Sequence, residues 1–212
     1  MFNRKNLSIK PLSERKHDLA ASMASSLIAT RESEIDERIQ KVADCINTAR
    51  AKDSSTILFM GGHVSRSGVQ EYLIDLMEKG YISCLAMNGA GIIHDYEFAL
   101  IGATTESVAR YVKEGQFGLW KETGMLNDII NDAYQKRDSA GMGESIGRFI
   151  ENGAFPYKDL SLLAAGYRFQ VPVTVHVGIG YDIIHEHPNC NGAATGALSY
   201  NDFLKLVSVV QK

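Results

Sequence analysis

The chain has 212 residues, of which 45% are hydrophobic and 22% are charged, and its formal net charge is −3. This composition is typical of an ordinary globular protein, and the charge gives no electrostatic case for binding nucleic acid or an anionic membrane. No apolar run approaches the length of a membrane span, and the N-terminus lacks the apolar core of a signal peptide. The 3 cysteines are widely spaced, which argues against a disulfide framework, so we expect a cytoplasmic protein.

We expect an N-terminal arm or strap over residues 1–34 and one domain over residues 35–212, because residues 1–17 are polar. A helix is predicted from Ser33, in the N-cap position, to Arg50. Its apolar residues recur at helical spacing, which predicts that the helix covers one face of a sheet; they are Ile35, Ile39, Val42 and Ile46.

A short buried strand is predicted over residues 56–60, followed by Gly61-Gly62 and a hydroxyl-rich loop. The loop leads into a helix that ends at Gly80. A strand, a glycine turn and a helix N-terminus in this order present backbone N–H groups to a phosphate in α/β folds. The alternative is a tight turn in which Ser65 or Ser67 caps the helix.

The next predicted strand, residues 82–87, also ends in a glycine loop, Asn88-Gly89-Ala90-Gly91, before a helix over residues 92–100. Two successive glycine loops should therefore lie along one edge of the sheet. Residues 105–153 are mostly helical in pattern. Within them, residues 116–120 are the segment expected to reach a ligand, although a lone Trp120 is more often part of a core.

A third strand is predicted over residues 171–177, because valine occupies every second position in a run that is apolar on both faces. Gly178 and Gly180 end it, and polar residues able to bind metals or protons follow or flank that end. They are His176, Asp182, His185, His187 and Cys190. The three strands predict a three-layer α/β/α, Rossmann-like fold with a mostly parallel sheet and a site at its carboxyl edge.

Three stretches carry a resemblance to a known family: FMGGHVSRSGVQEYL, ISCLAMNGAGIIHDYEFAL and SLLAAGYRFQVPVTVHVGIG. Together they resemble deoxyhypusine synthase and its shorter bacterial relatives, over about residues 35–210. The resemblance implies a Rossmann-like NAD-binding fold and a homo-oligomer, a tetramer in that family. It implies that two loops hold NAD; their residues here are Ser65, Arg66, Ser67, Asn88, Gly89 and Ala90.

The sequence also departs from the synthases. Ile93 and His94 stand where the synthases have two acidic residues that bind the polyamine. In the synthases, the nucleophilic lysine lies in a segment after the helix that corresponds to residues 202–210, and we expect a C-terminally shortened relative or a piece of a longer chain. Deoxyhypusine synthesis is therefore not expected, because spermidine's ammonium groups need paired anions when they lose water.

Three functions fit these residues. In the first, a protein that binds NAD and a small-molecule ligand carries out hydride or imine chemistry on a small amine or amino acid. A histidine (His94, His176 or His185) is then the general acid or base, and Asp182 orients it. In the second, a divalent metal binds to His185, His187 and Cys190. In the third, the fold is kept without catalysis.

Overall fold

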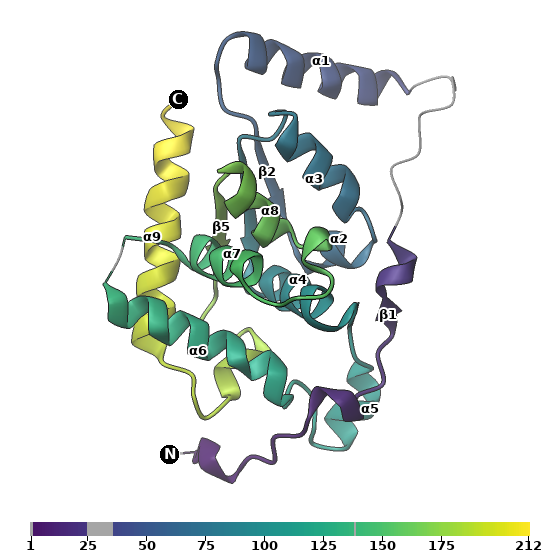
Figure 1. Ribbon diagram of the computed structural model, residues 1–212, viewed down its shortest axis with the longest axis vertical. Helices are drawn as coiled ribbons and strands as arrows, with labels where there is room; N and C mark the ends of the chain where they lie inside the picture. Colours follow the sequence, from purple (N-terminus) through teal and green to yellow (C-terminus); the bar gives the residue numbers. More distant parts are fainter. Residues whose placement is uncertain (1, 25–35, 138) are drawn as a thin grey trace.

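The computed structural model describes residues 2–24, 36–137 and 139–212. Its centre is a parallel three-stranded sheet in the order β2 (Ile57–Met60), β3 (Cys84–Asn88) and β5 (Val173–His176). Phe59, Ala86 and Thr174 are aligned across it. Helices make up most of the rest of the chain (Figure 1). The prediction of an α/β fold with a parallel sheet is confirmed at this level.

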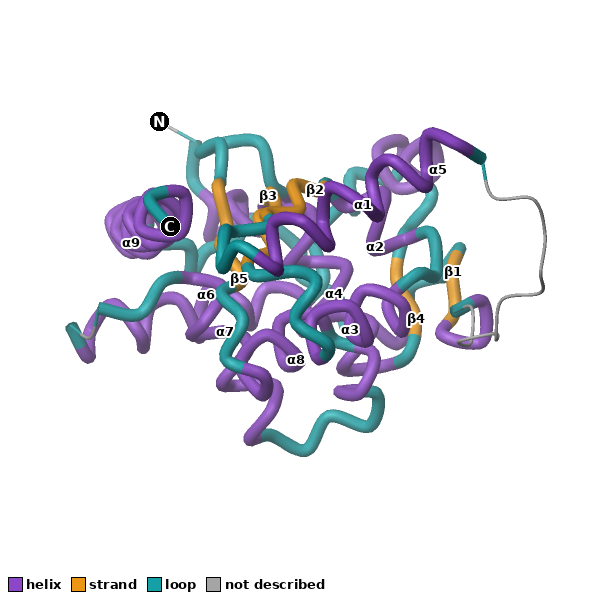
Figure 2. Tube along the Cα trace, turned by 90° about the horizontal axis from the view of Figure 1, so that it is seen from above, coloured by secondary structure: helices purple, strands orange, loops and turns teal. Residues whose placement is uncertain are grey.

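One face of the sheet is buried beneath a layer of helices (Figure 2). These are α3 (Gln70–Glu78), α4 (Gly89–Ile101), α7 (Met142–Asn152) and α8 (Leu162–Phe169), with α6 (Lys121–Lys136) packed beside α7. Alternate strand residues point into this layer, as the two-residue period of a strand requires: Leu85, Met87, Val173 and Val175. Each such side chain contributes roughly 1.5–3 kcal/mol by burial.

The long helix α9 (Gly192–Val210) packs against β5 and part of β3, and Figure 1 shows it beside β5. Two of its side chains bond the outer edge of β5. The Val175 N–H donates to the Asp202 carboxylate over 2.9 Å. The Ser199 hydroxyl donates to the Val175 carbonyl over 2.9 Å and accepts from the Val177 N–H over 3.2 Å.

The outer edge of β5 is covered by α9. A valine-rich strand without a partner on one side should be a template for association, because its backbone groups are unpaired. In β5 those groups are instead bonded by α9. The strand at the other edge, β2, has no such cover in the described part of the chain, and the Phe59 side chain is 65% exposed.

Helix α1 (Glu37–Ala51) does not cover the sheet, so that prediction is wrong. None of its residues is buried, and Figure 1 shows it at the top of the molecule, apart from the helices of the core. Its apolar residues Ile39 and Val42 are mostly exposed. Asp36 caps it by accepting from the Arg38 N–H over 2.8 Å, and the predicted cap at Ser33 lies outside the described residues.

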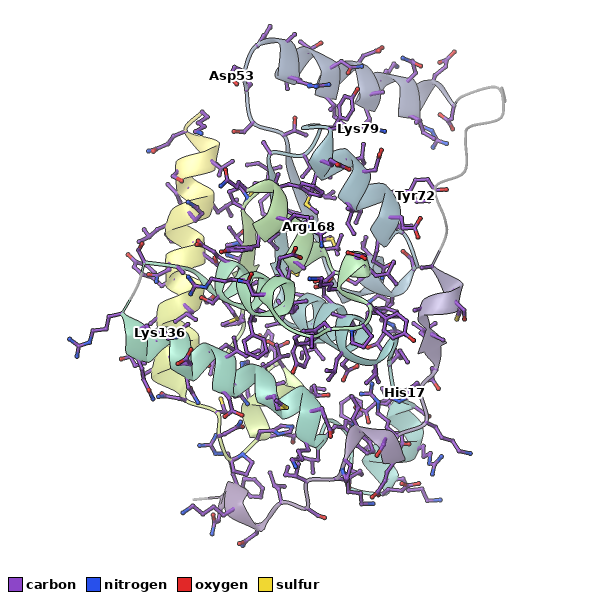
Figure 3. The ribbon with its side chains drawn as sticks, in the orientation of Figure 1. His17, Asp53, Tyr72, Lys79, Lys136 and Arg168 are labelled. Atoms are coloured by element: carbon purple, nitrogen blue, oxygen red, sulfur yellow. The ribbon has the colours of Figure 1, made fainter. Side chains whose placement is uncertain are left out.

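The N-terminal strap, residues 2–24, lies against the helical layer and is bonded to it at several points. Leu12 is buried, and β1 (Leu19–Ala20) pairs antiparallel with β4 (Ala103–Thr104). Figure 3 labels His17, whose Nδ1 accepts from Arg15 Nε over 3.1 Å. The expected boundary at residue 34 falls outside the described residues.

Several boundaries differ from those predicted. The loop after β2 contains a short helix, α2 (Gly62–Arg66), and α4 begins at Gly89, so Asn88 is its N-cap and not part of a loop. Helix α5 (Val108–Lys113) precedes the 116–120 segment, in which Trp120 is buried as the sequence suggested. Among the described residues, no helix combines the length and apolar character that a membrane crossing would need.

Candidate functional site

Two openings lie where the strands of the sheet end. The first, the strand-end groove, has a volume of about 530 Å³ and is lined at the three strand ends by Gly61, Asn88 and His176. The second, the polar cavity, has a volume of about 260 Å³. Gly61 and Asn88, the N-cap residues of α2 and α4, line the groove, whereas Arg66 of α2 and Ala90 of α4 line the cavity. The polar side chains lining the cavity are Arg15, Arg66, His94, Glu97, Thr105, Glu106 and Asp182.

The first turn of α4 carries the second predicted loop. Asn88 caps the helix, its side chain accepting from the Gly91 N–H over 3.1 Å. The Asp182 carboxylate lies so close to Gly89 that an added Cβ would collide with it. A carboxylate at a helix N-terminus is stabilised by the helix dipole. Asp182 therefore occupies the position that an anionic ligand of α4 would take.

His94, one of the predicted catalytic residues, lines the polar cavity and is held by a buried hydrogen-bonded chain. The Thr104 hydroxyl donates to Glu97 over 2.6 Å, so its oxygen must accept in the contact with His94 Nδ1 at 2.8 Å. His94 therefore carries its proton on Nδ1, and Nε2 is free to accept one. Burial lowers the pKa of His94 to about 4, so the ring is neutral at pH 7.

Glu97, at the other end of this chain, is paired with an arginine from the N-terminal strap. Arg15 donates to both carboxylate oxygens over 2.8 and 2.7 Å, and both side chains are 1% exposed. Burial acts to raise the pKa of Glu97, but the hydrogen bonds and charge of Arg15, with the hydroxyls of Thr104 and Thr123, bring it below its usual value. Glu97 is therefore an ionised acid fixed behind His94.

Sequence reasoning missed Arg15, Glu97 and Thr104. Glu97 follows His94 by three residues in one helix, a spacing that puts both on one face, and this could have identified it. No sequence pattern connects Arg15 to Glu97, because the pairing depends on how the strap lies across the fold.

Thr105 also lines the polar cavity, and its backbone is strained. Its φ angle is +68°, a left-handed conformation that is a genuine outlier for a β-branched residue. Its side-chain hydroxyl is buried and has no hydrogen-bond partner. Strain of this kind together with an unpaired polar atom is typical of functional sites.

The residues of the first predicted loop have different positions. Arg66 lines the polar cavity, and its buried Nε has no hydrogen-bond partner. Ser65 is buried with an unpaired hydroxyl, whereas Ser67 is exposed and its hydroxyl donates to the Val64 carbonyl over 2.7 Å. Ala90 lines the cavity beside Arg66.

Asp182 and His185 form a loosely spaced pair at the cavity wall. His185 Nδ1 accepts from the Gly180 and Asp182 N–H groups over 3.1 and 3.3 Å, so the neutral ring carries its proton on Nε2. That nitrogen lies 4.0 Å from Asp182 Oδ2, too far for a hydrogen bond, and neither atom has another partner. Burial raises the pKa of Asp182, and the His185 charge partly opposes this.

The other predicted residues lie elsewhere. His176 lines the strand-end groove and bonds to Thr174 over 3.0 Å, so the structure separates it from His94. His187 is buried and donates from Nε2 to the Gly118 carbonyl over 2.8 Å. Within residues 2–24, 36–137 and 139–212, no three His, Cys, Asp or Glu side chains are grouped to hold a metal ion. The structure thus gives the site proposed at His185, His187 and Cys190 no support.

No protein-family model matches the chain, and no curated protein matches it. Among solved structures, unliganded AgrE is similar at 18% identity and a TM-score of 0.48, covering 81% of this chain and 23% of its own. ArgZ, an arginine dihydrolase from cyanobacteria, is 17% identical with a TM-score of 0.46, covering 76% and 21%. A LOR/SDH protein from Methanococcus maripaludis S2 is 19% identical with a TM-score of 0.45, covering 82% and 50%.

The chain therefore spans between about a fifth and a half of the length of these proteins. AgrE has also been solved in a ternary complex with ornithine and NAD⁺. At these identities and TM-scores the likeness is one of coarse fold, and no argument about function rests on it.

Proposed function

We propose that this protein binds NAD at the carboxyl ends of β2, β3 and β5 and acts on a small molecule held in the adjoining polar cavity. The observation that carries the proposal is the position of the His94 chain: a neutral histidine with a free Nε2 stands beside the strand ends where Rossmann-like folds bind dinucleotides. The resemblance to deoxyhypusine synthase implies the same cofactor.

The residues fit the cofactor in part. Gly61 ends β2 with open space around it, since an added Cβ would meet only Asn88 Nδ2, at 3.6 Å. In this proposal the dinucleotide backbone lies over Gly61 and Asn88, which line the strand-end groove. The N-terminus of α4 is blocked by Asp182, so the pyrophosphate reaches that helix only if Asp182 moves.

The nicotinamide ring supplies hydride transfer when NAD is bound. The chain's own residues would handle the proton. His94 Nε2 accepts a proton from an amine or hydroxyl of the ligand, while Thr104 and the ionised Glu97 hold the ring in the tautomer that leaves this nitrogen free. The ionised Glu97 favours the positive charge that His94 gains on protonation, whereas burial and the charges of Arg66 and Arg15 oppose it.

The experiment is a calorimetric titration of NAD⁺ and NADH into the protein and into two variants, Gly61→Asp and Gly61→Asn. Gly61 has a φ of −107°, which any residue can adopt, so both variants should fold. The aspartate places a negative charge beside the pyrophosphate and should weaken binding at least about tenfold, whereas the uncharged asparagine of equal size should weaken it less. Equal affinities for the two variants, or no binding by the unchanged protein, would refute the placement.

A further inference from the structure

The charges around the polar cavity do not all have partners. Arg15 and Glu97 neutralise each other, and Glu106 accepts from Trp120 Nε1 over 2.8 Å and from the Gly118 N–H over 3.0 Å. Arg66 and Asp182 are left. Among the described residues, Arg66 makes no ion pair, and the nearest basic group to Asp182 is His185 Nε2, at 4.0 Å.

Each of these groups has one polar atom that is withdrawn from water. Arg66 Nε and Asp182 Oδ2 are buried atoms without a hydrogen-bond partner, and the Asp182 side chain is only 9% exposed. Buried polar and charged groups in folded proteins are normally paired, because the loss of hydration is otherwise uncompensated. One unpaired cation and one unpaired carboxylate around the same small cavity are therefore the signature of a missing partner that carries both charges.

Resting on the proposed function, we infer that the polar cavity binds a small zwitterion of the amino-acid type, with its carboxylate on Arg66 and its ammonium group on Asp182. The Thr105 hydroxyl, which is buried and unpaired, provides a further donor or acceptor for the ligand. Thr105 lines the cavity with a left-handed backbone. Its carbonyl accepts a hydrogen bond from the Asp18 N–H over 3.0 Å, which fixes it to the N-terminal strap.

The size of the cavity agrees with a small ligand. Its volume of about 260 Å³ corresponds to roughly nine water molecules at about 30 Å³ each, room for an unbranched amino acid but not for a dinucleotide. The lining also includes the apolar residues Ile93, Val108 and Phe117. A linear aliphatic side chain fits that apolar lining.

The test uses three probes of similar length: norvaline, pentylamine and pentanoate. Norvaline carries both charges, pentylamine carries the ammonium group alone, and pentanoate carries the carboxylate alone. Binding is measured by calorimetry with and without saturating NAD⁺, so that a failure to bind NAD does not prevent the zwitterion arm from being read. Norvaline should bind at least about tenfold more tightly than either single-charge probe. If pentylamine or pentanoate binds as tightly as norvaline, or if none of the three binds, the assignment is overturned.

Two variants locate the charges. Arg66→Gln should reduce the affinity for norvaline to that for pentylamine and leave the affinity for pentylamine unchanged. Asp182→Asn should reduce the affinity for norvaline to that for pentanoate and leave the affinity for pentanoate unchanged. Arg110→Gln removes an arginine from an exposed pair with Glu114 and is the control that should leave all three affinities unchanged. Unaltered norvaline binding in either cavity variant would overturn the assignment of that charge.

Thr105→Gly provides a readout that a purely structural role would not give. Glycine accepts the left-handed backbone without strain, so the melting temperature should stay level or rise while norvaline binding weakens. A lower melting temperature with unchanged norvaline binding would show that Thr105 serves packing alone and would overturn its part in the site.

Discussion

Removing Arg15 should strongly destabilise the folded protein at neutral pH. In Arg15→Ala, the Glu97 carboxylate stays buried and keeps only the hydroxyls of Thr104 and Thr123 as partners. Breaking a buried pair by removing one member costs about 3–5 kcal/mol, because an uncompensated charge remains in the interior. Against a total stability of about 5–15 kcal/mol, this is about a fifth or more of the stability of a typical domain.

Urea unfolding measures the loss directly. With an m-value of about 2 kcal/mol/M, the midpoint should fall by about 2 M in Arg15→Ala. Replacing both partners by neutral residues, in Arg15→Met with Glu97→Gln, should recover at least about 2 kcal/mol of the sum of the single losses, since no buried charge is left unpaired. Arg38→Ala, which breaks the exposed pair with Asp36, is the control and should leave the midpoint where it is.

The pH dependence gives the sharper discrimination. In the unchanged protein the pKa of Glu97 is held below its usual value, so its contribution is present above the unfolded pKa and is lost as pH falls through the folded pKa. In Arg15→Ala, burial should raise that pKa instead, and the deficit relative to the unchanged protein should shrink as pH falls from 7 toward about 4.3. A deficit below about 1 kcal/mol at pH 7, or one that does not change with pH, would refute this account of the pair.

Two other predictions follow from the sheet and its edges. Burial raises the pKa of Asp202 to about 7, so folding favours its protonated form and stability falls as pH rises from about 3.9 to about 7. Asp202→Asn should therefore gain stability relative to the unchanged protein between pH 5 and pH 8. A difference between the two urea midpoints that stays constant over this range would contradict the prediction. We expect the chain to form homo-oligomers through the uncovered face of β2 and α9, where Phe59, Phe203 and Val210 are exposed. Phe59→Lys should therefore lower the mass that light scattering measures after size exclusion. A monomeric unchanged protein would contradict this prediction.

The sequence predicted the parallel strands well, because each is a short apolar run ended by a glycine or a polar cap. Residues 56–60, 82–87 and 171–177 overlap β2, β3 and β5 closely. It failed for α1, whose apolar spacing indicated burial although none of its residues is buried. Helical periodicity shows that a helix has an apolar face; it does not show that another part of the described chain covers that face.

The candidate site was predicted in part. Arg66, Ala90, His94 and Asp182 were identified from the strand ends, and all four line one cavity. Their partners were not identified, because Arg15 lies in the strap, Thr104 in a two-residue strand and Thr105 directly after it, and none of these has a sequence signature. The structure does not group His185 with His187, since His185 Nε2 lies 4.0 Å from Asp182 Oδ2 while His187 Nε2 donates to the Gly118 carbonyl.

Asp182 and Asp202 have similar positions in the fold but differ in how their carboxylates are bonded. Each lies at the start of a helix, so close to a glycine that an added Cβ would strike the carboxylate: Asp182 at Gly89 of α4, and Asp202 at Gly141 before α7. Asp202 Oδ2 accepts from the Gly143 and Val175 N–H groups, and these bonds join α7, α9 and β5. Asp182 Oδ2 has no hydrogen-bond partner, and the residue lines the polar cavity. The two acids share a position beside a helix start and differ in Oδ2, which has no partner in Asp182, as the proposed ligand site requires.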